Sequence, residues 1–131
     1  MTHIDIPNII DFLNTQTAIT DITGSRIFWW TPSDEDEILW IYMTVGIVTE
    51  VQASDCEKRD RIEFRMLWDN ENTTYKSLKE LDNILFDLLQ TTQDYNWFEV
   101  YKVVNQNLVS WYDPKNRKVL IRDMIFYYVN S

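Results

Sequence analysis

Glycine is scarce in this chain. Only two glycines, Gly24 and Gly46, occur among 131 residues, and they stand far apart. The phosphate loop of nucleoside triphosphatases and the dinucleotide-binding fingerprint each need several glycines within a few positions, because the backbone must approach a phosphate closely. No register of this sequence supplies them, so both kinds of nucleotide-binding site are excluded.

Cysteine and histidine are just as scarce, with one copy of each, Cys56 and His3. A single cysteine forms no internal disulfide, which indicates a reducing, cytosolic setting. A structural zinc site lacks its usual thiolate and imidazole ligands. A Ser-His-Asp or Cys-His nucleophile would need His3, near the N-terminus, to reach a distant partner. We therefore expect a protein that is not an enzyme, uses no cofactor and binds no metal.

Acidic residues raise two further kinds of site. Residues of suitable type occupy positions 1, 3, 5, 9 and 12 of a calcium-loop spacing, namely Asp69, Glu71, Thr73, Ser77 and Glu80. Position 6 is Thr74 instead of glycine, so we interpret this segment as the acidic start of a helix. The run Asp34–Glu37 lacks the apolar neighbours of a general acid or base, and we interpret it as a solvated loop.

Long apolar runs are missing as well. The longest uncharged apolar stretch, Ile38–Thr49, is shorter than the roughly 20 residues that cross a bilayer. The segment Met1–Pro7 has neither the basic nor the apolar region of a signal peptide. We expect a soluble protein with no membrane partner.

Charge is strongly one-sided. Twenty-one acidic and twelve basic residues give a net charge of −9, so the average field repels phosphate backbones and anionic lipids. Two basic clusters stand beside acids and turn-like stretches, and we interpret both as solvated loops: Lys58, Arg59 and Arg61, and Lys115, Arg117 and Lys118. We expect no specific binding of nucleic acid.

Apolar residues are plentiful, at 45% of the chain, and aromatic residues make up 15%. This content is far above that of a disordered acidic tail, so the chain folds. No repeat, linker or low-complexity tract divides the sequence. Residues 1–131 therefore form a single predicted domain, of a size that buries roughly two-thirds of its unfolded surface.

Apolar spacing predicts two helices and five strands. Leucines at intervals of three or four mark the clearer helix, and the alternation of Ile62, Phe64 and Met66 marks the clearest strand. The expected elements are a helix at 6–14, strands at 26–30, 38–51 and 61–68, a helix at 74–91, and strands at 98–112 and 118–129. This order predicts an α+β fold, with a mainly antiparallel sheet of about five strands and two helices packed on one face.

Aromatic side chains fall on both faces of the predicted strands. Trp40 and Tyr42 alternate with an apolar set in one strand, and Phe126 and Tyr128 do so near the C-terminus. Two helices cover only one face of a sheet, so the remaining aromatics either pack under loops or meet another chain. We favour the second alternative and predict these four residues as an oligomer interface.

A short stretch after the first helix carries a family resemblance. The residues Gly24-Ser25-Arg26-Ile27-Phe28, followed by Pro32, are similar to a Gly-x-Arg-Ile-aromatic stretch and its following proline in the tail terminator proteins of tailed phages. These proteins, also called tail completion proteins, act in head–tail joining. The element order resembles that family over nearly the whole chain.

The resemblance implies a structural phage or prophage protein that forms a ring, usually a hexamer. Such a ring caps the tail-tube protein, stops its polymerisation and docks onto the head-connector protein, first in the host cytoplasm and then in the virion. It implies no catalytic residue. The acidic loop of Asp34, Glu35, Asp36 and Glu37 would line the bore or its rim, where like charge keeps DNA from sticking.

A second class of function stays open on charge alone. A small acidic phage-encoded protein also fits an inhibitor that mimics the charge of DNA and blocks a host nuclease or regulator. A ring former is expected to run as a multimer, whereas a charge mimic is expected to be a monomer or dimer.

Overall fold

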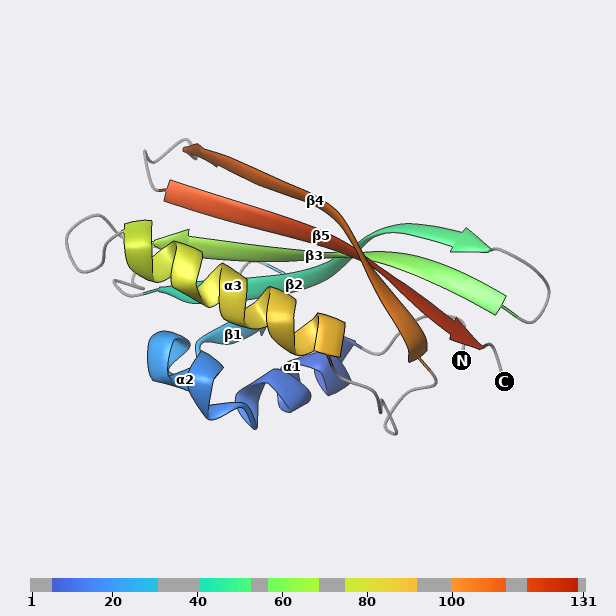
Figure 1. Cartoon of the computed structure of the whole chain (residues 1–131), viewed down its shortest axis with the longest axis horizontal. Coiled ribbons are helices and arrows are strands. Elements are labelled where there is room, and N and C mark those ends of the chain that lie inside the picture. The colour runs from blue at the N-terminus through green and yellow to red at the C-terminus, as the bar shows by residue number, and fades with distance from the viewer. Residues whose placement is uncertain are drawn as a thin grey trace.

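The computed structural model describes residues 6–30, 41–52, 57–68, 75–91, 100–112 and 118–129. Most of these residues belong to helices and strands. In chain order these elements are α1 (Ile6–Asn14), α2 (Thr17–Thr23), β1 (Ile27–Trp29), β2 (Tyr42–Gln52), β3 (Glu57–Trp68), α3 (Tyr75–Thr91), β4 (Val100–Tyr112) and β5 (Lys118–Val129) (Figure 1). The bounds of α1 and β5 are those predicted, and the other predicted elements differ at their ends by a few residues.

The strands within the described residues form one five-stranded sheet in the order β1-β2-β3-β5-β4. β1 runs parallel to β2, whereas the pairs β2–β3, β3–β5 and β4–β5 are antiparallel. The predicted α+β fold with a mainly antiparallel sheet is confirmed. β5 follows β4 in the chain but lies between β3 and β4.

Alternation along the strands gives the sheet two different faces. On β3, Ile62, Phe64 and Met66 are fully buried, while Arg65 points to the opposite face. Directly opposed residues of an antiparallel pair share a face, so Met43, opposite Met66, belongs to the buried set. The register therefore assigns every paired residue to one face or the other.

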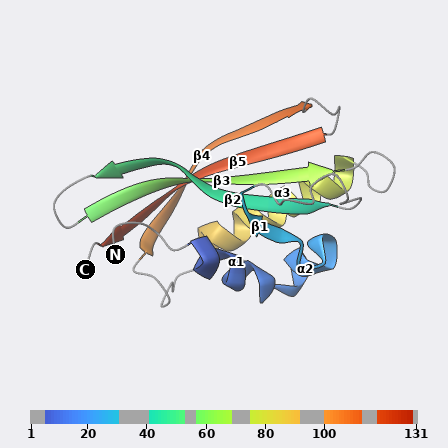
Figure 2. The same ribbon diagram turned by 180° about the vertical axis from the view of Figure 1, so that it is seen from behind.

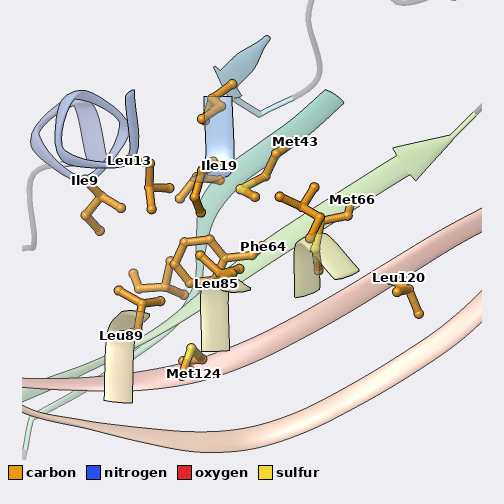
Figure 3. Close-up of a cluster of buried hydrophobic side chains, with 14 of the residues drawn as sticks. Ile9, Leu13, Ile19, Met43, Phe64, Met66, Leu85, Leu89, Leu120 and Met124 are labelled. Carbon is orange, nitrogen blue, oxygen red and sulfur yellow. The ribbon is translucent and has the colours of Figure 1, made fainter. Parts of the chain in front are cut away.

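The helices cover the face that carries Phe64. Figure 1 shows α3 in front of the sheet, and Figure 2, seen from behind, shows the strands in front of α3. One apolar cluster joins the three described helices to this face and includes Leu13 of α1, Ile19 of α2, Leu85 of α3 and Met124 of β5 (Figure 3). Burying each such side chain contributes roughly 1.5–3 kcal/mol. This cluster holds the two layers together.

Helix α2 is an addition to the predicted fold, which had two helices. Its sequence Thr-Ala-Ile-Thr-Asp-Ile-Thr is mostly β-branched, and such residues have low helix propensity. The helix forms despite this low propensity, because it buries Ile19 completely in the core. Gly24 ends the helix in the left-handed region at φ 57°, and its N–H donates to the carbonyl of Thr20 at 2.7 Å.

The stretch Gly24–Phe28 connects α2 to the sheet through hydrogen bonds of Arg26. The Arg26 side chain donates from Nε to the carbonyl of Ile41 at 3.0 Å, and the Arg26 carbonyl accepts from the N–H of Met43 at 2.9 Å. Burial lowers the pKa of the Arg26 guanidinium from its usual value, because desolvation disfavours the charge. The stretch that carries the family resemblance therefore has a structural task here.

Candidate interaction surfaces

Three of the four residues predicted as an oligomer interface lie inside the chain. Phe126 and Tyr128 are fully buried in the main core, and Tyr42 is buried in a smaller cluster with Leu67 and Val119 on the opposite face of the sheet. Side chains enclosed by their own chain have no surface left for a second subunit. The interface prediction is corrected for these three residues, and Trp40 lies outside the described residues.

The acidic run Asp34, Glu35, Asp36 and Glu37 also lies outside the described residues. Its assignment to a bore or rim stays a prediction. The flanking residues are described: Trp30 follows β1, and Ile41, which is buried, precedes β2.

A buried ion pair joins α3 to β5. The guanidinium of Arg122 donates from Nε to Oδ1 of Asp82 at 2.9 Å and from Nη2 to Oδ2 at 2.6 Å, and its Nη1 donates to Oδ1 of Asn105 at 2.7 Å. Its Cζ lies 4.7 Å from the centroid of the Phe86 ring. Asp82 is 1% exposed, so no substrate reaches the carboxylate, and the pair is a structural tie between the layers.

Sequence reasoning missed this pair, although each partner leaves a signal. Asp82 lies within the leucine stripe of α3, beside Leu81 and one turn from Leu78 and Leu85. Arg122 lies in the row of apolar residues on the core face of β5. Two opposite charges, each on the apolar stripe of its own element, indicate a buried pair.

The helix-free face of the sheet carries a row of arginines on β3. Arg61 lies 3.7 Å from Asp123, Arg65 lies 2.8 Å from Glu63, and Arg59 lies 5.7 Å from the centroid of the Tyr127 ring. These three side chains are half-buried on a regular strand. The interpretation of Arg59 and Arg61 as residues of a solvated loop is therefore wrong, because β3 begins at Glu57.

Exposed apolar side chains gather at the two edges of the sheet. The large apolar residues that are exposed in the described part of the chain are Trp29 at 56%, Trp30 at 49%, Val109 at 43% and Leu108 at 37%. The first two lie at β1 and the last two on β4, which are the two outermost strands. At about 4.8 Å per strand, these edges are roughly 19 Å apart. The surface thus has two separate apolar patches, at opposite ends of one sheet.

Trp30 is held against the sheet by an unusual backbone. Its φ is 61°, in the left-handed region that bulky residues rarely adopt, and its N–H donates to the carbonyl of Val45 at 3.1 Å. Its ring lies over Gly46, where a Cβ atom would overlap the ring. Gly46 therefore leaves the space in which Trp30 packs on the helix-free face.

Gly46→Ala is expected to lower the free energy of unfolding by about 1–2 kcal/mol, because the added methyl group displaces the Trp30 ring. In a Trp30→Ala background the same change is expected to cost nothing, since alanine is favoured over glycine inside a strand. Urea unfolding of the wild type, the two single variants and the double variant gives the coupling energy between the two positions. Strictly additive effects of the two substitutions would contradict the contact.

Two further features of the described surface are small hollows on helices. Two shallow hollows are each lined along one helical segment, the first by Asn8, Asp11, Phe12 and Thr15 and the second by Lys76, Lys79, Glu80 and Asn83. Within the described ranges no three His, Cys, Asp or Glu residues are grouped as metal ligands. No described helix is long and apolar enough to span a membrane.

Comparison with solved structures finds this fold in a component of a virion particle. No protein-family model matches the chain, and no curated protein matches it either. Among solved structures, a chain from the virion of a native gene transfer agent particle is similar, with a TM-score of 0.71 over 93% of this chain and 92% of that chain. The sequence identity is 6%, so the likeness establishes a shared fold.

Proposed function

We propose that this chain is a structural protein of a phage-like particle, and that it forms a ring of the tail terminator kind at the end of a tail tube. The observation that carries the proposal is the fold shared, over nearly the full length of both chains, with a component of a virion particle. The stretch Gly24–Phe28 supports it from the sequence side. In this role the ring caps the tube and joins it to the head connector, and no catalytic step is involved.

The arrangement of exposed apolar residues supports a ring over a two-fold dimer. A two-fold contact uses one patch that meets its own copy, whereas a ring uses two different patches on opposite sides of each subunit. Here the two patches lie at opposite edges of the sheet, at Trp29 and Trp30 and at Leu108 and Val109. Six subunits is the number that the family resemblance implies.

Co-assembly with a tail-tube protein tests the proposed function. The chain is expressed together with the tail-tube protein encoded nearest to it in its source genome, and tube lengths are measured by electron microscopy. We expect tubes that stop growing, with a ring at one end, and unlimited tubes when the chain is left out.

Native mass measurement of the chain alone separates the proposal from the acidic inhibitor. A multimer that binds tube ends supports the ring. A monomer or dimer that ignores tubes and inhibits a host nuclease would replace it with the DNA-mimic function.

A further inference from the structure

The two edges of the sheet are matched in three respects: backbone, faces and charge. β4 pairs only with β5, and β1 pairs only with β2, within the described part of the chain. A strand edge presents backbone N–H and C=O groups that a further strand satisfies. The edges therefore define their own occupant, which is another extended strand.

On β4, the C-terminal half is the open part of the edge. In the N-terminal half, Gln90 of α3 already donates to the carbonyl of Val103 at 3.2 Å. In the later half Asn107, Leu108, Val109 and Ser110 are all exposed, although a strand under a helix layer hides every second residue. A bulge lies between Asn105 and Asn107, and the Asn107 side chain accepts the N–H of Leu108 at 2.9 Å. That local bond is the one that an incoming strand would replace.

The apolar residues at the two edges occupy corresponding faces. Leu108 is opposite Arg122, and Trp29 is beside Val45, so both belong to the helix-covered face. Val109 is opposite Ile121, and Trp30 packs on Gly46, so both belong to the helix-free face. In an antiparallel continuation from β4 into β1, Leu108 opposite Trp29 on the helix-covered face would place Val109 opposite Phe28 on the helix-free face, with Trp30 as its diagonal neighbour.

Strand direction agrees with the same continuation. β1 and β2 run one way, and two antiparallel steps through β3 and β5 followed by a third leave β4 running opposite to β1. Rotation about an axis along the strands keeps each strand's direction and keeps the helices on one side. β4 of one copy would then meet β1 of the next copy as an antiparallel pair, and repetition closes a ring.

The distribution of charge favours contact between copies at these edges over contact elsewhere on the surface. Each copy has a net charge of −9, so two copies repel each other over most of their surfaces. The segments Ile27–Trp30 and Val103–Tyr112 contain no charged residue. Contact at these segments brings the fewest like charges together, and burial of the exposed tryptophans supplies the attraction.

We propose that neighbouring copies of this chain join edge to edge, with the Leu108–Val109 part of β4 in one copy against Trp29 and Trp30 of the next. This contact rests on the proposed ring and names the surfaces that close it. The subunit sheets then form one continuous band, with the helices of every copy on the same side of it.

Two edge-blocked variants test the contact. Val109→Lys blocks the β4 edge, and Trp29→Lys blocks the β1 edge, in each case at an exposed position where we expect the fold to tolerate the change. Ala18→Lys, at an exposed position on α2, adds the same charge away from both edges and is the matched control. Native mass spectrometry and light scattering at several concentrations measure the number of subunits, and circular dichroism checks the fold.

Each edge variant alone is expected to lose the ring and run as one copy, while Ala18→Lys keeps it. An equimolar mixture of the two edge variants is expected to run at twice the mass of one copy and no higher, because one good β1 edge still meets one good β4 edge. A ring that survives Val109→Lys overturns the edge contact and leaves the proposed function standing. A Trp29→Lys chain that forms a dimer by itself overturns it in favour of a two-fold β4–β4 contact. An unsubstituted chain that neither multimerises nor caps tubes overturns both proposals.

Discussion

Asp82→Ala is expected to lower the free energy of unfolding by about 3–5 kcal/mol, because it leaves the buried Arg122 guanidinium without its carboxylate. Both oxygens of Asp82 accept from Arg122, and the Arg122 side chain is 9% exposed, so water is poorly placed to take over. Asn105 would retain one bond to the cation, but it carries no negative charge. Urea unfolding followed by circular dichroism at neutral pH measures the loss.

The double variant Asp82→Leu with Arg122→Met is the control for this prediction. Replacing both partners by apolar side chains of similar volume removes the buried charges together, and such replacements are often neutral or stabilising. We expect most of the stability lost in Asp82→Ala to return. A loss below about 1 kcal/mol in Asp82→Ala would mean that the guanidinium reaches solvent, contrary to the structure.

Phe126→Ala is expected to lower the free energy of unfolding by about 3–5 kcal/mol at every protein concentration. Phe126 is fully buried, and its ring centroid lies 6.3 Å from that of Phe64, so truncation leaves a cavity between β5 and β3. A core residue acts within one chain, whereas an interface residue acts through association, which depends on concentration. Unfolding of wild type and variant over a hundredfold range of concentration separates the two cases.

Trp29→Ala is the matched aromatic control for Phe126→Ala. Trp29 is 56% exposed, and we expect its truncation to change the stability of the dilute chain by less than about 0.5 kcal/mol. If instead Phe126→Ala cost little in dilute solution and abolished association, Phe126 would belong to an interface after all.

The parts of the fold that could be predicted from the sequence are those with a strong period. Helix α3 has leucines at every turn, and β3 alternates almost without a break, so both were found within a few residues. Helix α2 could not be found, because its β-branched sequence resembles a strand and only the burial of Ile19 makes it a helix. Likewise, no local pattern in Ile27–Trp29 reveals a parallel partner.

The candidate surfaces were harder to predict, for a related reason. Alternation divides a strand into two faces but does not say which face is covered. Phe126 and Tyr128 lie on the face under the helices, and Tyr42 belongs to a second apolar cluster on the other face. Exposure at Trp29 and Val109 arises because each lies at an edge strand, and strand order is a property of the whole sheet.

The position of β5 has a consequence for how the protein is made. β5 is synthesised after β4 yet lies between β4 and β3, so the pairing of β4 seen in the described part of the chain forms only after β5 has left the ribosome. Until then the nascent chain exposes the apolar sides of β2, β3 and α3 without the strand that completes them. Folding must therefore wait for this late insertion, and a pause in translation before residue 118 would prolong an aggregation-prone state.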